Sequence, residues 1–200
     1  MTTYISVDVE TVGLVPGYHG LLSVGACLVN NIGEQFHEVI CPLNTNFVGS
    51  FLNVDDDTLD WWETQEDANR RLNNKFFEVD RPNILTVDDY LIRMQDVAVQ
   101  FYDWLTTFES PLMFVAWPAS FDYPFIQHMF LSSDMENPFN YRTIDVKSYA
   151  CGKLGLDFNA ERTEFPDWLY EEPDFPHDAL SDAIAQATVF TRLLEYNSGT

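Results

Sequence analysis

Two acidic residues stand one residue apart on the first apolar stretch of the chain, in the segment "VDVETVG". On a strand, the side chains of Asp8 and Glu10 would leave the same face, roughly 6.5–7 Å apart along it. Two buried anions this close repel each other unless a positive charge lies between them. Carboxylate oxygens suit Mg²⁺ or Mn²⁺. The pair therefore indicates a divalent-cation site, although an exposed acidic strand end has the same pattern.

Two later segments carry ionisable side chains near the ends of predicted elements. Asp122, in "WPASFDYPFI", follows an apolar strand and precedes a helix, which is also the place of an ordinary helix N-cap. In "HDALSDAIAQA", His177 lies five residues before Asp182, at the start of the last helix. Each segment alone fits a surface position, but together with the first acidic pair they form an ordered set of four acids and one histidine.

This set resembles the DEDD superfamily, and the histidine places the resemblance in its DEDDh, or DnaQ-like, branch of 3′-5′ exonucleases. The motifs that carry it are "DVETVG", "ASFD" and "HDALSDA", in the family's order. Asp145, in "TIDVKSYA", is similar to a further segment of that family. The stretch "TLDWWETQEDANRRL" looks like a subgroup of phage exonuclease A-type enzymes and bacterial 3′-5′ exoribonucleases, although Trp61 and Trp62 are also explained as core or loop aromatics.

The resemblance implies a two-metal hydrolysis of phosphodiesters. Two Mg²⁺ or Mn²⁺ ions, roughly 3.5–4 Å apart, would hold the scissile phosphate. Asp8, Glu10, Asp122 and Asp182 would be the metal ligands, and His177 the general base, which must be neutral to accept a proton. The expected reaction releases nucleoside 5′-monophosphates from the 3′ end of single-stranded or short RNA or DNA.

Residues near these ligands are expected to bind the 3′ end through backbone groups, apolar wedges and base stacking. The substrate-binding candidates are Thr11, Val12, Gly13, Phe121 and Trp61. Val12 and Leu14 are the candidate wedges, and the two aromatics would stack on bases, which contributes roughly 1–3 kcal/mol per base. Trp117 and Pro118 stand where many family members have His-Asn, so an asparagine contact with the substrate is missing or supplied elsewhere.

The net charge of −22 limits how the chain meets nucleic acid. Such a surface repels a polyanion at long range, so metal ions act on the strand only in direct contact. This predicts a distributive enzyme for short or single-stranded 3′ ends. Candidates for a basic approach path, which are also explained as scattered solubilising charges, are Arg70, Arg71, Lys75, Arg142, Lys147 and Lys153.

Three rival functions remain open from the sequence. The acidic charge suits a non-catalytic protein that mimics nucleic acid. A degenerate exonuclease fold would act as an interaction protein. A ribonuclease H-like nuclease of another kind would cut internally, although the histidine before the last acid favours the exonuclease branch.

Apolar periodicity predicts the elements that hold these residues. Strands are expected over 3–10, 21–30, 33–43 and 111–117, and helices over 55–72, 86–108, 123–131 and 178–196. We expect Asp57 to cap the first helix, and Thr86 to cap the second with Asp89 at the capping-box position. A loop is expected over 161–176. The buried side of the last helix should carry Leu180, Ala183, Ile184, Ala187, Phe190 and Leu194.

Strands followed by alternating helices and strands predict an α/β fold with a mixed sheet. The resemblance narrows this to a ribonuclease H-like fold with roughly five strands flanked by helices, in one exonuclease domain over residues 1–200. The three cysteines form no C-x-x-C pair, which predicts reduced thiols and a cytoplasmic location, in a bacterium or a phage-infected host. No signal peptide or membrane-spanning run is expected, and a homodimer is left open.

Overall fold

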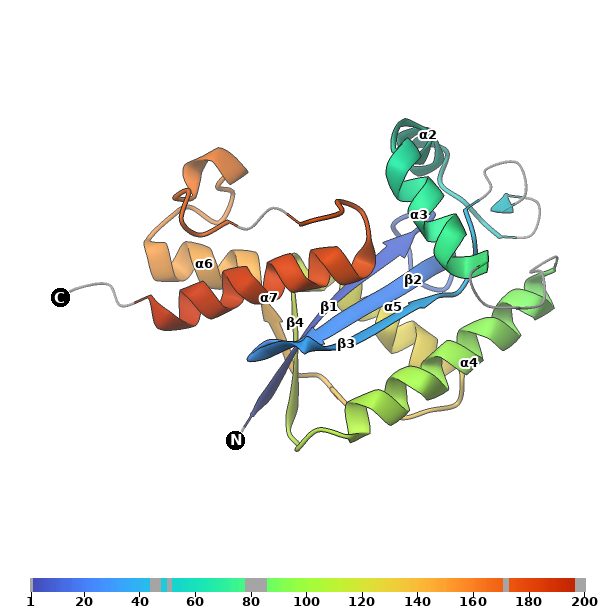
Figure 1. Cartoon of the computed structure of the whole chain (residues 1–200), viewed down its shortest axis with the longest axis horizontal. Helices are drawn as coiled ribbons and strands as arrows, with labels where there is room; N and C mark the ends of the chain where they lie inside the picture. Colours follow the sequence, from blue (N-terminus) through green and yellow to red (C-terminus); the bar gives the residue numbers. More distant parts are fainter. Residues whose placement is uncertain (1, 44–47, 50–51, 78–85, 171–172, 197–200) are drawn as a thin grey trace.

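A five-stranded mixed sheet forms the centre of the structure, which is a computed structural model that describes residues 2–43, 48–49, 52–77, 86–170 and 173–196 (Figure 1). The strand order is β3–β2–β1–β4–β5. The strands are β1 (Thr3–Thr11), β2 (Leu21–Leu28), β3 (Asn31–Val39), β4 (Leu112–Ala116) and β5 (Thr143–Asp145). The pairs β1–β2 and β2–β3 are antiparallel, and β1–β4 and β4–β5 are parallel. The predicted mixed, roughly five-stranded sheet is confirmed.

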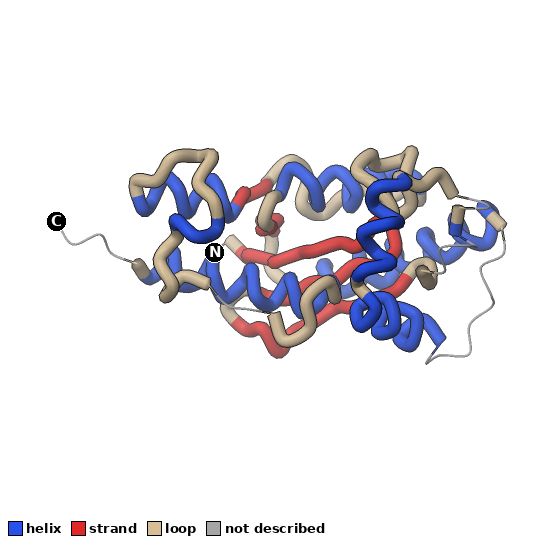
Figure 2. The backbone as a smooth tube through the Cα atoms, turned by 90° about the horizontal axis from the view of Figure 1, so that it is seen from above, coloured by secondary structure: helices blue, strands red, loops and turns tan. Residues whose placement is uncertain are grey.

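Helices cover both faces of this sheet, whose strands lie side by side in the view from above (Figure 2). The helices are α2 (Asp56–Thr64), α3 (Glu66–Phe77), α4 (Val87–Thr106), α5 (Ala119–Ser132), α6 (Val146–Leu154) and α7 (Ala179–Glu195), with the short 3₁₀ helix η1 (Arg162–Glu164) between the last two. One apolar core joins the sheet to α4 and α5, and a second joins it to α6 and α7. Among the described helices, none has the length and apolar run to cross a membrane.

The first strand sends its apolar and polar side chains to opposite faces, as its alternation predicts. Ile5, Val7 and Val9 are buried in the core shared with α4 and α5. Asp8 and Glu10 point to the other face, where α7 lies with its N-terminal end near the end of β1 (Figure 1). The sheet therefore holds two carboxylates on its α7 side.

The parallel pairing of β1 with β4 stops half-way along β1. It covers Thr3–Ser6, so the later residues of β1 have no strand partner on that side. The helix α5 begins there, and the backbone N–H of Val9 donates to Oδ1 of Asp122 at 3.1 Å. The end of the short strand thus brings a third acid against β1.

Gly25 on β2 lets the start of α7 approach the sheet. Gly25 pairs with Asp8 across the antiparallel ladder. A Cβ atom at this glycine would lie 2.1 Å from the backbone carbon of Ala179 in the first turn of α7. Only a residue without a side chain permits this approach, which carries the first turns of α7 down to the acids of β1.

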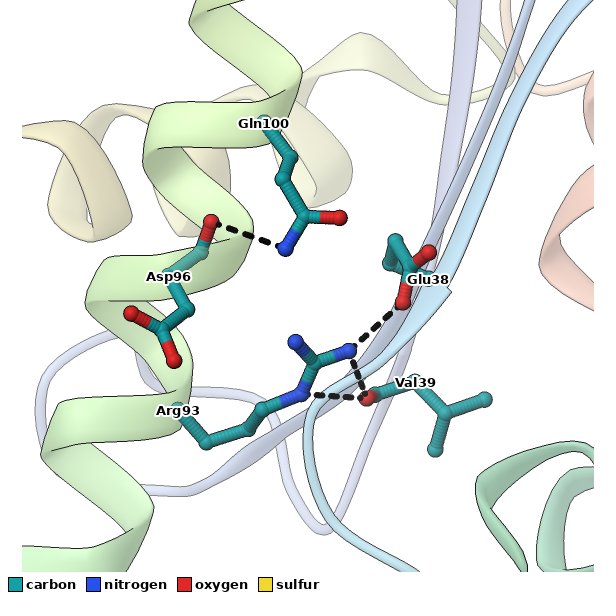
Figure 3. Close-up of polar contacts among 5 residues, drawn as sticks. All are labelled: Glu38, Val39, Arg93, Asp96 and Gln100. Carbon is teal, nitrogen blue, oxygen red and sulfur yellow. Dashed lines mark hydrogen bonds and ion pairs between the residues drawn. The ribbon is translucent and has the colours of Figure 1, made fainter. Parts of the chain in front are cut away.

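A partly buried arginine fixes α4 to the edge strand (Figure 3). Arg93 donates from Nη2 to Oε2 of Glu38 at 2.5 Å and from Nε to the carbonyl of Val39 at 3.2 Å. A charge-assisted contact with little exposure to solvent is stronger than a surface ion pair. It holds the long helix under the sheet.

Several expected element boundaries are corrected by the structure. The expected helix over 55–72 is two helices that meet at Gln65, and Asp55 rather than Asp57 caps the first, by accepting from the N–H of Thr58 at 2.9 Å. The helix expected over 123–131 begins at Ala119, so Asp122 lies inside α5 and is not its cap. Thr86 caps the second helix as predicted, by accepting from the N–H of Asp89 at 3.1 Å, and its hydroxyl donates to the Asp89 carboxylate.

The buried side of α7 also differs in part from the prediction. Ala183, Ala187 and Phe190 are buried as expected. Leu194 is exposed, and its neighbour Leu193 is fully buried instead. Leu180 and Ile184 are half-buried rather than buried.

Gly25→Ala tests the close approach of α7. The added methyl group meets backbone atoms that cannot move alone, so we expect the free energy of unfolding to fall by about 1–3 kcal/mol. Chemical denaturation measures it. The control is Gly152→Ala in the middle of α6, where a Cβ atom meets nothing within 4 Å and should stabilise the chain by about 0.5–1 kcal/mol. Equal effects of the two substitutions would contradict this account.

Candidate functional site

Three carboxylates from two elements come together at one end of the sheet. Asp8 and Glu10 come from β1, and Asp182 comes from the first turns of α7. One oxygen of each lies within 4.8 Å of the others. These acids lie in a cleft of about 410 Å³, called here the main cleft, which runs between the sheet end, α5, α7 and the segment around η1. Carboxylate oxygens at this spacing fit a hard divalent cation.

Asp122 lies beside this cluster and is 2% exposed. One of its oxygens is held by the backbone N–H of Val9. Among the neighbouring charges, the charge of Asp122 raises the pKa of Asp8 the most. The fourth predicted acid therefore lies close enough to the other three to repel them electrostatically, but it is not part of the tight cluster.

The four carboxylates oppose one another's ionisation. Burial, followed by repulsion from the other acids, raises the pKa of Asp8 and of Glu10 well above the usual range. Burial raises the pKa of Asp122 to about 8 and that of Asp182 to about 6. A cation is the natural partner for four acids gathered in one cleft. The residues fit a divalent metal ion.

His177 lies at the same cleft and is neutral at pH 7. Burial, and then the charge of Arg71, lower the pKa of its imidazole below the usual value. Its backbone is in the left-handed region, with φ of 58°, which histidine adopts more readily than most residues. The ring lies edge-on to Trp61, with 4.7 Å between centroids. A neutral imidazole on the wall of an acid-lined cleft can accept a proton.

The loop before α7 is fixed from several sides. Arg71 donates to the carbonyl of Pro176 at 2.7 Å and lies over the ring of Phe175. Asp178 caps α7 by accepting from the N–H of Ser181 at 3.0 Å. His37 lies 3.8 Å from Asp178, but burial lowers the pKa of His37 to about 4, so this is a neutral contact. The position of the catalytic candidate on this loop is therefore set by α3 and β3 as well.

Gln186 is a site residue that the sequence did not reveal. Its Nε2 donates to Oδ1 of Asp8 at 2.6 Å, and its Oε1 accepts from the N–H of Trp117 at 3.0 Å. It lies one helical turn after Asp182, which is the one sequence signal that could have pointed to it. It connects a metal-ligand candidate to the segment where the family's His-Asn is replaced.

A second cleft of about 470 Å³, called here the side cleft, adjoins the main cleft at Glu10. Its lining includes three of the predicted substrate residues, Thr11, Trp61 and Phe121. Trp61 is 40% exposed, whereas Trp62 is buried and donates from Nε1 to the carbonyl of Thr11. The first tryptophan therefore belongs to the site, and the second belongs to the core that supports it.

The structure corrects one substrate prediction and places the others. Val12 is fully buried, and its backbone N–H and carbonyl are bonded to Gly20 and Asp55, so it cannot act as a wedge. Leu14 is 68% exposed on the side cleft and is the remaining wedge candidate. The carbonyl of Gly13 accepts from the hydroxyl of Thr11 at 2.8 Å, so the predicted backbone segment is held in a tight turn.

The predicted basic path is not assembled as one surface. Of its six members, Lys147 is the one that lines the main cleft. Arg71 supports the loop of His177, and Arg70 is paired with Asp67 on the surface. Arg162, which was not predicted, lies on the main cleft as well.

Comparison with known proteins agrees with this geometry. Residues 3–194 match a family described as the 3′-5′ exoribonuclease Rv2179c-like domain. The chain is 30% identical over 196 residues to the 3′-5′ DNA exonuclease Cap18 of Escherichia coli, which covers 96% of this chain and 91% of that protein.

Two of the solved structures that share the fold illustrate the likeness. The S. pombe Pop2p structure with bound Mg²⁺ and Mn²⁺ has a TM-score of 0.64 at 11% identity, over 96% of this chain and 83% of that one. The nuclease domain of 3′hExo, a DEDDh family member bound to rAMP, has a TM-score of 0.54 at 14% identity, over 96% of this chain and 92% of that one. The expected ribonuclease H-like fold is confirmed.

The raised pKa values predict how stability depends on pH without metal. The folded acids bind protons that the unfolded chain has already lost, so the folded state is favoured at low pH and loses this stability as the pH rises. In EDTA, we expect the free energy of unfolding to fall from about pH 4, the usual range of these acids, through the values of about 6 and 8 given for Asp182 and Asp122. Mg²⁺ should reverse the fall.

Asp8→Asn isolates this contribution. It removes one buried charge, so the fall with pH in EDTA should be shallower and the stabilisation by Mg²⁺ should be lost, as measured by thermal unfolding across pH. Asp96→Asn, at an exposed position on α4, is the control and should match the wild type. An identical pH profile for both variants would refute the role of repulsion.

Gln186→Leu tests the support of Asp8. Leucine keeps the bulk but cannot donate to the carboxylate, and partners of this kind typically change metal affinity by about 10–100-fold. We expect weaker Mg²⁺ affinity in a thermal-shift titration. Gln186→Asn, whose side chain is too short to span both contacts, should have a Mg²⁺ affinity between those of the wild type and Gln186→Leu. Unchanged affinity in Gln186→Leu would show that the hydrogen bond has no part in holding the ligand.

Proposed function

Because this chain belongs to the Rv2179c-like 3′-5′ exoribonuclease domain family, we propose that it removes nucleoside 5′-monophosphates from the 3′ end of single-stranded or short RNA or DNA. It is a 3′-5′ exonuclease of the DEDDh type. The observation that carries this is the gathering of Asp8, Glu10 and Asp182, with Asp122 beside them, next to a neutral His177. Residues 1–200 would act as one exonuclease domain, in keeping with the family match over residues 3–194.

We assign two divalent cations, Mg²⁺ or Mn²⁺, to the four acids. The Pop2p structure, which shares the fold, holds both kinds of ion. When bound, such ions lower the pKa of a water molecule and stabilise the leaving oxygen. Asp8, Glu10 and Asp182, whose oxygens lie within 4.8 Å of one another, would hold these ions. Asp122, whose carboxylate accepts from the N–H of Val9, would contribute a fourth acid from α5.

His177 would act as the general base. Its lowered pKa leaves it neutral at pH 7, and its place on the wall of the main cleft puts it beside the acids. The edge-on contact with Trp61 and the bonds that fix its loop limit the motion of the ring. It accepts the proton of the attacking water, so the water can attack the phosphorus opposite the leaving 3′ oxygen.

The terminal nucleoside would lie in the side cleft. Trp61 and Phe121 offer apolar ring surface for its base, and Leu14 offers an exposed edge that separates it from its neighbour. Stacking contacts of this kind accept any base, because every base has an aromatic face. The arrangement suits an enzyme without sequence preference.

A labelled-strand assay tests the proposal. Single-stranded RNA and DNA of one sequence, labelled at the 5′ end, are incubated with Mg²⁺, with Mn²⁺ or with EDTA. We expect a ladder that shortens from the 3′ end and is absent in EDTA, with the faster ladder naming the preferred sugar. His177→Ala should slow it by about 10²–10⁴-fold.

Controls separate this function from its rivals. A circular single strand should survive, since it has no 3′ end, and its cleavage would show an internal nuclease. Asp96→Asn should cut like the wild type. If neither strand is shortened with either metal ion, the protein is not a 3′-5′ exonuclease under these conditions and the non-catalytic acidic protein becomes the better account.

A further inference from the structure

The main cleft continues well beyond the acids, toward the segment around η1. Its far end is walled by side chains that the reaction at the acids does not use, namely Trp117, Lys147, Arg162, Phe165 and Tyr170. Two of these are cations and three are aromatic. This part of the main cleft is called here the far end.

The far end and the side cleft differ in charge. The described lining of the side cleft contains three acids, Glu10, Asp55 and Asp57, and neither lysine nor arginine. The far end carries two cations, Lys147 and Arg162, and one acid, Glu161. The two clefts share Val9, Glu10 and Phe121, so they adjoin at the acid cluster.

This difference matches the chemistry of a strand that is cut at its 3′ end. The terminal nucleoside ends in a free hydroxyl, and its one phosphate is the group that is cut. Every nucleotide further upstream adds a phosphate. An acid-lined cleft without cations suits the phosphate-free end, and a cleft with two cations suits the upstream backbone.

Lys147 is placed to meet a phosphate from outside the protein. It lies in the first turn of α6 and is half-buried in a chain with 32 acidic residues. Within the part of the chain that the structure describes, it makes no ion pair. Asp145, two residues earlier, is engaged instead by the N–H groups of Ser148 and Ala119. A half-buried lysine without an acid partner favours an anionic ligand.

The aromatic side chains form an ordered wall beside these cations. The rings of Trp117 and Phe165 are 5.4 Å apart, and those of Phe165 and Tyr170 are 5.8 Å apart. Arg162 lies 4.4 Å over the ring of Tyr170, which orients its guanidinium. Trp117 also donates its backbone N–H to Gln186, the residue that holds Asp8. The wall is therefore coupled to the acid cluster.

We propose that the far end is a subsite for the penultimate nucleotide, in which Lys147 and Arg162 bind the phosphate on its 5′ side and the Trp117 wall receives its base. This rests on the proposed function and adds the direction of the strand: the 3′ terminal nucleoside enters the side cleft and the chain leaves past η1.

A pair of dinucleotides that differ in one phosphate tests the subsite. Thymidine dinucleotide offers only the scissile phosphate, and its 5′-phosphorylated form adds the phosphate that the far end is proposed to bind. We expect the wild type to cleave the phosphorylated form with about tenfold higher kcat/KM, the effect of one contact of about 1.4 kcal/mol.

Lys147→Gln and Lys153→Gln are the matched variants. Both remove one positive charge from α6, but Lys153 lies over Tyr149 and is not part of the described lining of the main cleft. Lys147→Gln should bring the ratio of the two kcat/KM values to about one, and Lys153→Gln should leave it near the wild-type value of about ten. Binding of both dinucleotides in Ca²⁺, measured by calorimetry, should give the same ranking without turnover.

The outcomes separate the subsite from the enzyme activity. A wild type that cleaves both dinucleotides equally, or a ratio that falls equally in both variants, overturns the subsite and leaves the exonuclease intact. If the labelled strands are not shortened either, a calorimetric preference that only Lys147→Gln abolishes refutes the exonuclease and retains the phosphate subsite.

Discussion

Repulsion between buried carboxylates is the constraint around which this structure is arranged. Burial in the main cleft raises the pKa of four acids, so the polypeptide must hold together groups that favour separation. Packing in the rest of the structure holds these acids together. The core of α4 and α5 fixes one face of β1, and α7 is held against the other face at Gly25. The packing energy of the fold therefore offsets the repulsion between the acids of the site, and active sites commonly gather like charges in this way.

The position of each acid follows from a different feature of the fold. Alternation along β1 places Asp8 and Glu10, a missing side chain on β2 admits the turn that carries Asp182, and the early end of β4 opens the edge that Asp122 fills. These features lie on separate elements. A site assembled from separate elements is rigid only if all of them are packed, which explains why the acids depend on both cores.

Much of the site could be read from the sequence because its signals are local. The spacing of Asp8 and Glu10 states their common face, and the capping residues Thr86 and Asp89 bond within one turn. The choice between Asp55 and Asp57 as a cap could not be made, since both residue types suit the position and only the backbone angles decide. Val12 was misplaced because the ladder shifts register between Glu10 and Thr11, which moves the valine out of the simple alternation and into the core. Gln186 could not be found, because its partner Asp8 is 178 residues away along the chain.

The two hydrogen bonds of Gln186 also limit how the main cleft can move and how its residues can vary among relatives. One side chain spans from the backbone of Trp117, on the wall of the main cleft, to the carboxylate of Asp8. A shift of that wall to admit another ligand would pull on the glutamine and rotate the carboxylate, so the two regions cannot drift independently. Relatives that differ in the segment at Trp117 should therefore also differ at the position of Gln186. A chimaera that exchanges only one of the two would keep the shape of the cleft but not the orientation of the Asp8 carboxylate.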